Sequence, residues 1–372
     1  MVCFALTLAL ITLASSMAQP LSFAAAEVTK LGVYDYFTEE SSPIIFNGAL
    51  LMLESIPVQY ANYDPTFSNC TAYFRIRDMH TLLTVVNITA TCNQAFGSAT
   101  VIPGINGASD TLIVLGTQWD RRSVPIPSSQ QSILRWSGPC TGPSPSNCTV
   151  NMFSSSSPLL EDNSWVTHVG GIQVPFGIYN TDAMSVPASA DSPYRWVIAL
   201  ETTSETARFL ASSSIDPLDL SSWQILNSSY TVPRFPDVGS CPSLRHDGTH
   251  FYYLTGGSNI HILRSSNLKD WVESTRNVLN HGDAGDCIIA PSWFGPYVPV
   301  GTALQHLTTC GISGNFGDDS DVDLAQWDTP FGNAANGPVT LLQYGSGDQR
   351  TFGFSNLAIY NGTMTSFLQS FF

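Results

Sequence analysis

Charged residues are scarce in this chain of 372 residues: Asp, Glu, Lys and Arg together make up 12% of it. That is about half of their usual share in globular proteins. Lys and Arg number 14 against 29 acidic residues, which gives a formal net charge of −15 at pH 7, and no basic cluster interrupts this balance. Because phosphate contacts need lysine and arginine, we expect that the protein does not bind nucleic acid.

The motifs of several common enzyme classes are also missing. The sequence contains no glycine-rich phosphate loop, no Gly-x-Ser-x-Gly elbow and no His-Glu-x-x-His segment. Nothing therefore indicates a nucleotide-binding protein, a serine esterase or a zinc protease. No two cysteines have the spacing of a zinc ribbon, so a structural zinc ion is not expected. We expect that the protein requires no cofactor.

Long apolar runs are missing except at the start of the chain. Residues 1–26 carry no charged side chain, and the apolar run 3–14 is too short to cross a bilayer as a helix. Small residues predict that 1–18 is a signal peptide, with 24–26 as a second possible cleavage region and an uncleaved anchor as the alternative interpretation. No later segment is apolar enough to span a membrane. We therefore expect a secreted, extracellular protein without membrane attachment after cleavage.

Five Asn-x-Ser/Thr sequons support export through a eukaryotic secretory pathway. Each pattern is weak alone, but together with the signal peptide they predict a glycoprotein. The sequons begin at Asn69, Asn87, Asn147, Asn227 and Asn361.

The cysteines allow several disulfides. Cys140 and Cys148 bracket a short loop rich in proline, glycine and serine, and Cys70 and Cys92 form a second candidate pair. Cys3 lies in the predicted signal peptide, and a third pair could form between two of the three other cysteines, but the sequence leaves the connectivity open. The remaining three are Cys241, Cys287 and Cys310.

An internal repeat is the most informative feature that is present. Residues 196–223 and 247–271 both read as two strands joined by a turn, a Ser-rich turn, a leucine and a tryptophan. Weaker copies of the strand that precedes the Ser-rich turn occur at 73–78 and 133–137. Repeats of this length are typical of stacked or circular architectures. Four arginines mark equivalent points at blade-sized intervals: Arg75, Arg135, Arg208 and Arg264.

The chain is rich in glycine and proline and has no long helical periodicity, which favours an all-β protein. The repeat spacing predicts a single five-bladed β-propeller over residues 27–372. A β-sandwich lectin is the alternative, but it would not explain the four-strand recurrence. The predicted blades begin near Pro43, Phe96, Asp182, Pro242 and Asp321.

The second repeat carries a resemblance to a known group of proteins. The segment Arg264 to Trp271 (RSSNLKDW), preceded by the aromatic run 250–254, resembles the five-bladed propeller glycosidases of glycoside hydrolase families 43 and 32 and their relatives. The segment 241–248 resembles the inner strand and turn ahead of it. Only residues 240–271 carry specific motifs, although the rhythm covers most of the chain. The resemblance implies a glycoside hydrolase that cleaves furanoside or pentoside linkages in a polysaccharide or oligosaccharide.

The resemblance also implies three carboxylates in a pocket on the propeller axis, of which one protonates the leaving oxygen and another activates water. The helper aspartate of these families matches Asp182. The position of the acid reads Ser240-Cys241-Pro242, and the position of the base reads Ser42-Pro43. Two of the three expected carboxylates are therefore missing from the matching positions.

Nearby acidic residues are candidates to replace them. Glu40 lies just before the first predicted inner strand, and Asp237 is the carboxylate nearest to the missing acid. If residues 320–324 form a strand, Asp321 and Asp323 lie on one face, where two carboxylates favour a cation, an arginine or a shared proton. We expect this pair to face Asp182 across the pocket. A structural calcium ion and a solvated acidic turn are the alternatives for this stretch.

The departures from the family pattern leave two other functions open. A catalytically inactive propeller that binds glycans through the same pocket is favoured by the missing acid and base positions. A structural cell-wall or surface protein that uses its loops for contacts is the other.

Overall fold

The structure is a computed structural model, and a large part of the chain is described. The described residues are 28–36, 41–58, 64–104, 108–118, 148–202, 206–233, 238–257, 259–280, 322–327, 338–346 and 354–372.

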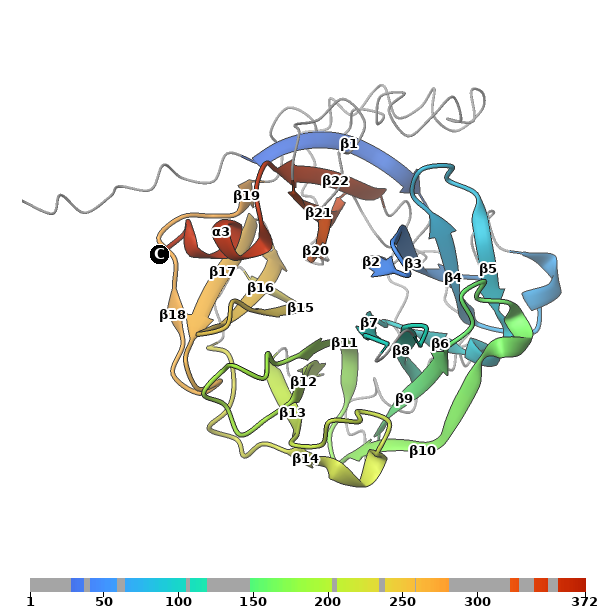
Figure 1. Ribbon diagram of the computed structural model, residues 1–372, viewed down its shortest axis with the longest axis horizontal. Coiled ribbons are helices and arrows are strands. Elements are labelled where there is room, and N and C mark those ends of the chain that lie inside the picture. Colours follow the sequence, from blue (N-terminus) through green and yellow to red (C-terminus); the bar gives the residue numbers. More distant parts are fainter. Residues whose placement is uncertain are drawn as a thin grey trace, which may run out of the picture.

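Five antiparallel sheets surround a central axis and form a five-bladed β-propeller, as predicted (Figure 1). In blades 1 to 4 the chain enters at the axis and moves outward, whereas blade 5 takes its outermost strand from the start of the described chain. The innermost strand of every blade therefore lies next to the axis, as is typical of a β-propeller.

The strands of the blades are as follows. Blade 1 contains β2 (Ser41–Phe46), β3 (Ala49–Pro57), β4 (Ala72–Asp78) and β5 (Thr84–Ile88). Blade 2 contains β6 (Gln94–Ala95), β7 (Ala99–Ile102), β8 (Thr111–Gln118), β9 (Cys148–Ser155) and β10 (Val166–Val174). Blade 3 contains β11 (Ile178–Ser185), β12 (Trp196–Thr202), β13 (Ala207–Ser212) and β14 (Trp223–Ile225). Blade 4 contains β15 (Val238–His246), β16 (Phe251–Gly257), β17 (Asn259–Ser265), β18 (Val272–Glu273) and β19 (Leu279–Asn280). Blade 5 contains β20 (Val322–Trp327), β21 (Val339–Ser346), β22 (Phe354–Tyr360) and β1 (Val28–Tyr36).

Blade 5 joins two distant parts of the chain and closes the ring. Its strand order from the axis outward is β20, β21, β22 and β1, so the first described strand completes the last blade. The pairing runs antiparallel from Val28 opposite Tyr360 to Tyr36 opposite Phe354. Hydrogen bonds between β1 and β22 therefore hold the two ends of the described chain together.

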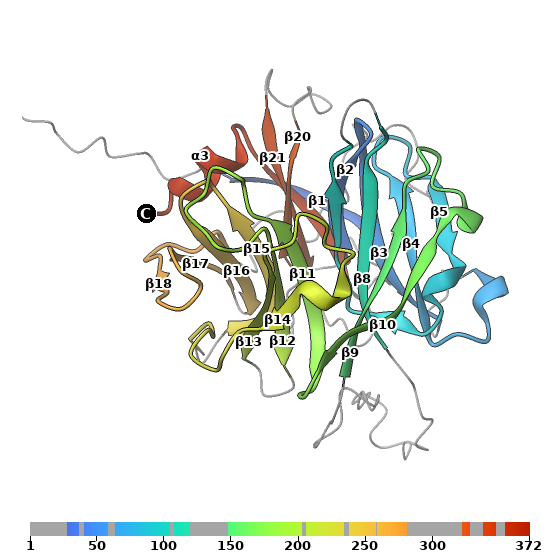
Figure 2. The ribbon, with the colours of Figure 1, turned by 60° about the horizontal axis from the view of Figure 1, so that its bottom comes forward.

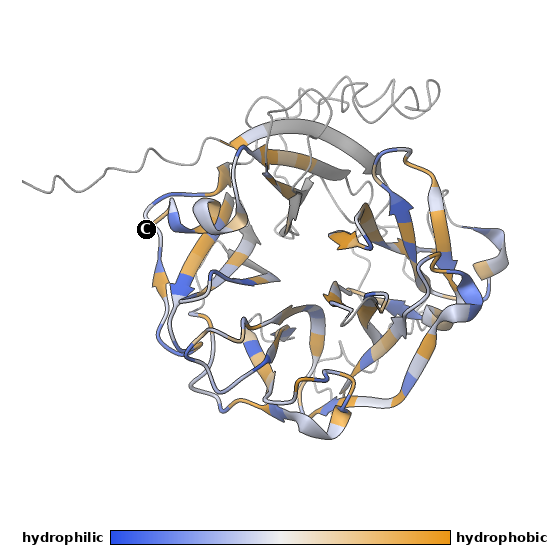
Figure 3. Ribbon diagram, in the orientation of Figure 1, coloured by the Kyte–Doolittle hydropathy of each residue, from blue (hydrophilic) through white to orange (hydrophobic). Residues whose placement is uncertain are grey.

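The core lies between neighbouring blades, and strand alternation builds it. Successive residues of a strand point to opposite faces. In β12, Val197 and Ala199 lie in the apolar cluster shared with blade 4, whereas Ile198 and Leu200 lie in the cluster shared with blade 2. Figure 3 shows the resulting distribution of hydrophobic residues along the strands of the blades.

The short helix α3 (Met364–Gln369) packs against blades 4 and 5 (Figure 1, Figure 2). Its Phe367 and Leu368 are buried in the apolar cluster that these two blades share. The side chain of Gln369 donates a 2.9 Å hydrogen bond to Asp247, on the turn between β15 and β16. Since α3 follows the last strand of blade 5 in sequence, these contacts fasten blade 5 to blade 4.

The repeat of the sequence corresponds to the second and third strands of a blade and the turn that leads to the fourth. Arg75, Arg208 and Arg264 lie on β4, β13 and β17, each the third strand of its blade. The copy predicted for blade 2, at 133–137, lies outside the described residues; the third strand of that blade is β9, which contains no arginine. The arginine was not the feature that the blades share.

Blades 2, 3 and 4 share a serine at the end of the third strand, where blade 1 has Asp78. Ser155, Ser212 and Ser265 each accept a hydrogen bond from the backbone N–H two residues later, at 3.2, 3.0 and 3.2 Å. In blades 2 and 3 this serine also shares a hydrogen bond with a second serine, Ser164 or Ser222, just before a tryptophan. The serine therefore forms the turn that starts the path to the outermost strand.

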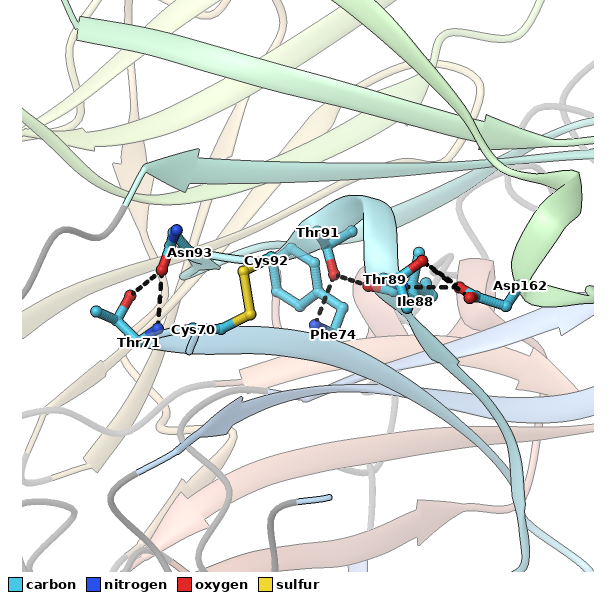
Figure 4. Close-up of a disulfide and its surroundings, with 9 residues drawn as sticks. All are labelled: Cys70, Thr71, Phe74, Ile88, Thr89, Thr91, Cys92, Asn93 and Asp162. Carbon is cyan, nitrogen blue, oxygen red and sulfur yellow. Dashed lines mark hydrogen bonds between the residues drawn. A yellow bond between two sulfur atoms is a disulfide. The ribbon is translucent and has the colours of Figure 1, made fainter. Parts of the chain in front are cut away.

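One predicted disulfide is present in blade 1. Cys70 and Cys92 are bonded, and they link the start of β4 to η2 (Thr89–Thr91) (Figure 4). Cys148 is buried in β9, while Cys140 lies outside the described residues. That second pairing stays a prediction.

Candidate active site

The innermost strands of the propeller carry a set of polar side chains that are buried near the axis. A buried polar group is costly unless it is hydrogen-bonded, so these side chains need hydrogen-bond partners. Blades 1, 3 and 4 contribute Ser41, Ser42, Asn180, Thr181, Asp182 and Ser243, all buried.

Asp182 forms the charged contact of this set. Its Oδ2 lies 2.9 Å from Nη1 of Arg245, and the side chains of the two residues are 2% and 17% exposed. The backbone N–H of Leu244 donates a hydrogen bond to the same carboxylate oxygen. Nη1 of Arg245 also donates to the Leu244 carbonyl at 2.6 Å. A buried charge needs such compensation, because its transfer out of water is costly.

Strand alternation places Asp182 at the boundary of blades 3 and 4. On the same face of β11, Met184 enters the apolar cluster shared with blade 4, whereas Ala183, on the other face, enters the cluster shared with blade 2. Asp182 therefore faces β15, the innermost strand of blade 4, which supplies both Leu244 and Arg245. The carboxylate and the guanidinium join two adjacent inner strands.

Of the five predicted carboxylates, only the side chain of Asp182 falls among the described residues. Asp323 is the second residue of β20, where it pairs with Gln343 of β21, but nothing further is described of its side chain. Glu40, Asp237 and Asp321 lie outside the described residues. In sequence they directly precede Ser41, Val238 and Val322, the first residues of three inner strands.

Arg245 is the site residue that sequence reasoning missed. It lies in the segment 241–248 that carries part of the family resemblance, and it is one of only 14 basic residues in the chain. An arginine on a predicted innermost strand, in a chain with few basic residues, is the feature from which its role in the site could have been predicted. Its partner could not be assigned without the tertiary structure.

A second buried charge cluster lies away from the axis. Glu54 of β3 is completely buried, and its Oε2 lies 2.6 Å from Nε of Arg75 and 3.3 Å from Nε of Arg77. These residues lie on the second and third strands of blade 1, on the face that also carries Met52 and Ile56. The cluster is a packing feature between strands and does not line the axis.

Neither a metal site nor a membrane-spanning helix is found in the part of the chain that the structure describes. No group of three or more His, Cys, Asp or Glu side chains there is placed to hold a metal ion. The acidic residues 318–321, for which a calcium ion was an alternative, lie outside the described residues. No described helix is long and apolar enough to cross a bilayer.

The fold defines the class of protein, a five-bladed β-propeller, and solved structures similar to it include glycoside hydrolases. The GH43_1 enzyme of Xanthomonas citri, complexed with xylotriose, has 10% sequence identity and a TM-score of 0.47, over 90% of both chains. A glycosyl hydrolase from Bacteroides ovatus has 11% identity and a TM-score of 0.42, over 92% of both chains.

A third match comes from work on the GH130 family, whose glycoside hydrolases target β-1,2 mannosidic linkages in Candida mannan. It has 10% identity and a TM-score of 0.43, over 88% of this chain and 85% of that one. No protein-family model and no curated protein matches the sequence. At this level of identity the matches show the fold.

Proposed function

We propose that the protein is a secreted glycoside hydrolase that binds a polysaccharide or oligosaccharide at the propeller axis and cleaves a furanoside or pentoside linkage. The observation that carries the proposal is the buried pair of Asp182 and Arg245 on adjacent inner strands. A buried ion pair is costly to build, and at the centre of a propeller it supplies oriented charge beside a binding region. The resemblance of residues 240–271 to glycosidases of families 43 and 32 supports the same chemistry.

Hydrolysis of a glycosidic bond needs two carboxyl groups with different protonation states. One, as an acid, gives its proton to the leaving oxygen while the bond from that oxygen to the anomeric carbon breaks; the other takes a proton from the attacking water. We assign Asp182 a positioning role, because it is almost fully buried and already accepts hydrogen bonds from Arg245 and Leu244. The proposed candidates for acid and base are Glu40, Asp237, Asp321 and Asp323.

Release of reducing sugar from a panel of polysaccharides tests this function. The four candidates are changed singly, as Glu40→Gln, Asp237→Asn, Asp321→Asn and Asp323→Asn. Loss of an acid or base is expected to lower kcat by about 10² to 10⁴, with the melting temperature retained. The exposed Asp191 provides the matched control, Asp191→Asn, which is expected to keep full activity.

A glycan-binding propeller without catalysis is the second candidate. The missing carboxylates at 42–43 and 240–242 favour it. It predicts no sugar release from any substrate of the panel, together with retained binding in titration calorimetry. Activity that survives all four single substitutions would contradict the proposed assignment of acid and base.

A further inference from the structure

The asparagines of the glycosylation sequons differ in their exposure to solvent. Asn69, Asn227 and Asn361 are exposed, whereas Asn87 is half-buried on β5, the outermost strand of blade 1. The fifth sequon, at Asn147, lies outside the described residues.

The amide of Asn87 is held by a charged partner. Its Nδ2 donates a 2.9 Å hydrogen bond to Oδ2 of Asp64, and its Oδ1 is buried. The other oxygen of Asp64 accepts hydrogen bonds from the backbone N–H and the hydroxyl of Thr66, at 2.9 and 2.8 Å. The hydrogen bonds from Thr66, with a smaller contribution from Asn87, hold the pKa of Asp64 below its usual value. At neutral pH this carboxylate is therefore ionised and can only accept hydrogen bonds.

The hydroxyl of the same sequon is also occupied. The backbone N–H of Thr89 donates to Oδ1 of Asp162 at 2.7 Å, and its Oγ1 lies 2.9 and 2.8 Å from the two carboxylate oxygens (Figure 4). Asp162 belongs to η4 (Asp162–Ser164) of blade 2. Both groups that define a sequon, the asparagine amide and the threonine hydroxyl, are thus used by contacts that hold blade 1 in place.

The sequon at Asn227 is arranged in the opposite way. Oδ1 of Asn227 accepts hydrogen bonds from the backbone N–H of Ser229, at 2.9 Å, and from the Ser229 hydroxyl. Both contacts lie within the sequon, on an exposed turn after β14. Among the described residues, no hydrogen bond occupies Nδ2 of Asn227. Asn361, between β22 and α3, and Asn69, between η1 (Pro65–Phe67) and β4, are also exposed at turns. Their sequon threonines are hydrogen-bonded, Thr363 to Ser366 and Thr71 to Asn93, so the exposure of the asparagine is what separates these sites from Asn87.

We propose that the secreted protein carries N-linked glycans at Asn69, Asn227 and Asn361 and that Asn87 stays unmodified. The proposal rests on the secretion that is part of the proposed function. In the transfer, Nδ2 forms a bond to the anomeric carbon of a lipid-pyrophosphate-linked oligosaccharide; it loses one proton, and the lipid pyrophosphate leaves. At Asn87 the acceptor nitrogen lies against Asp64 and the amide oxygen is buried, so the folded blade has no place for the sugar.

The test is peptide mapping of the full chain, secreted from eukaryotic cells and deglycosylated by peptide N-glycosidase in ¹⁸O water. The expected result is ¹⁸O-labelled aspartate at positions 69, 227 and 361, with unlabelled asparagine at 87. Asn69→Gln, Asn227→Gln and Asn361→Gln should each remove one glycan from the intact mass, and Asn87→Gln should remove none. An ¹⁸O label at position 87 would overturn the proposal. Absence of the ¹⁸O label from positions 69, 227 and 361 would overturn it as well.

A second variant tests the cause. Asp64→Ala combined with Asp162→Ala frees the amide and the hydroxyl of the Asn87 sequon, and a glycan at Asn87 is then expected in the secreted protein. If Asn87 stays unmodified in this variant, the two contacts are not what withholds it, and the assigned cause is wrong. Absence of hydrolase activity with the expected glycan pattern would bear on the proposed function alone.

Discussion

The carboxylate of Asp182 and the guanidinium of Arg245 lie 2.9 Å apart, and through them the innermost strands of blades 3 and 4 are joined. Neither strand pairs with the other in a sheet. Apolar packing is not directional, whereas an ion pair with a shared backbone contact at Leu244 sets one relative position. The pair therefore determines how the two blades meet at the axis.

Removing one partner of this pair is expected to destabilise the protein strongly. Asp182→Asn leaves the charge of Arg245 without its compensation, at a cost of about 3–5 kcal/mol. The measurement is the free energy of unfolding from urea titration. The exposed Asp191→Asn should change it by less than about 0.5 kcal/mol. The double variant Asp182→Asn/Arg245→Gln should lose less than the sum of the single losses, and strict additivity would show that the two residues are not coupled.

The contact of α3 with blade 4 is expected to depend on pH. Burial raises the pKa of Asp247, but hydrogen bonds from Gln369, His250, Thr249 and Tyr252 together outweigh it and hold the pKa at about 2. The usual value in an unfolded chain is about 3.9. Because the folded-state pKa is depressed, the stabilisation is complete above about pH 4 and is lost as the pH falls toward 2.

Asp247→Asn tests this dependence. Its melting temperature should lie below that of the unmodified protein at pH 7, and the difference should shrink between pH 4 and pH 2. The protection factors of residues 364–372 against hydrogen exchange should fall over the same pH range, since Gln369 loses its charged acceptor. A difference in melting temperature that is constant with pH would contradict the role of the ionised carboxylate.

The disulfide between Cys70 and Cys92 is expected to stabilise blade 1. It bridges a sequence separation of 22 residues, and closing a loop of this size restricts the unfolded chain by about 3 kcal/mol. Cys70→Ala/Cys92→Ala should lower the free energy of unfolding by about this amount. The unmodified protein in reducing agent provides the comparison. If no other reducible bond contributes to stability, it should unfold at the same denaturant concentration as the double variant.

Phe209 is expected to be one of the most sensitive positions of the interface between blades 3 and 4. It is completely buried, stacks on Trp271 with ring centroids 5.8 Å apart, and meets the edge of Tyr253. Phe209→Ala leaves a cavity in a closely packed interface and should cost about 3–5 kcal/mol. Ile225→Ala, at a side chain that is 39% exposed, is the control and should cost less than 1 kcal/mol, about the scale of a surface substitution. Equal losses for the two variants would contradict this assignment of the interface.

The repeat could be predicted from the sequence, but arginine marks it only in part. Arginine lies on the third strand of blades 1, 3 and 4, whereas Arg135, the residue predicted to mark blade 2, lies outside the described residues. The copy in blade 2 is the stretch 148–165, which contains no arginine but ends in the same Ser-rich turn and a tryptophan, Trp165. Serine is the better marker because its Oγ makes the turn itself, whereas the arginines serve different contacts. Arg75 pairs with Glu54, and Arg264 lies over the ring of Phe372.

The sequence by itself determined the class of the fold and the approximate start of every blade. Pro43, Phe96, Asp182, Pro242 and Asp321 were predicted, and the first strands begin at Ser41, Gln94, Ile178, Val238 and Val322. Strand alternation and turn residues act over a few positions, so they are legible in a linear sequence.

Only the tertiary structure decided which distant residues meet. Asp182 and Arg245 are 63 residues apart, Thr89 and Asp162 are 73 apart, and β1 closes the ring against β22. These contacts arise from how the blades pack around the axis. The spacing of residues along the sequence does not predict these contacts. The side chains are far apart in the sequence, and the packing of one blade on the next brings them together.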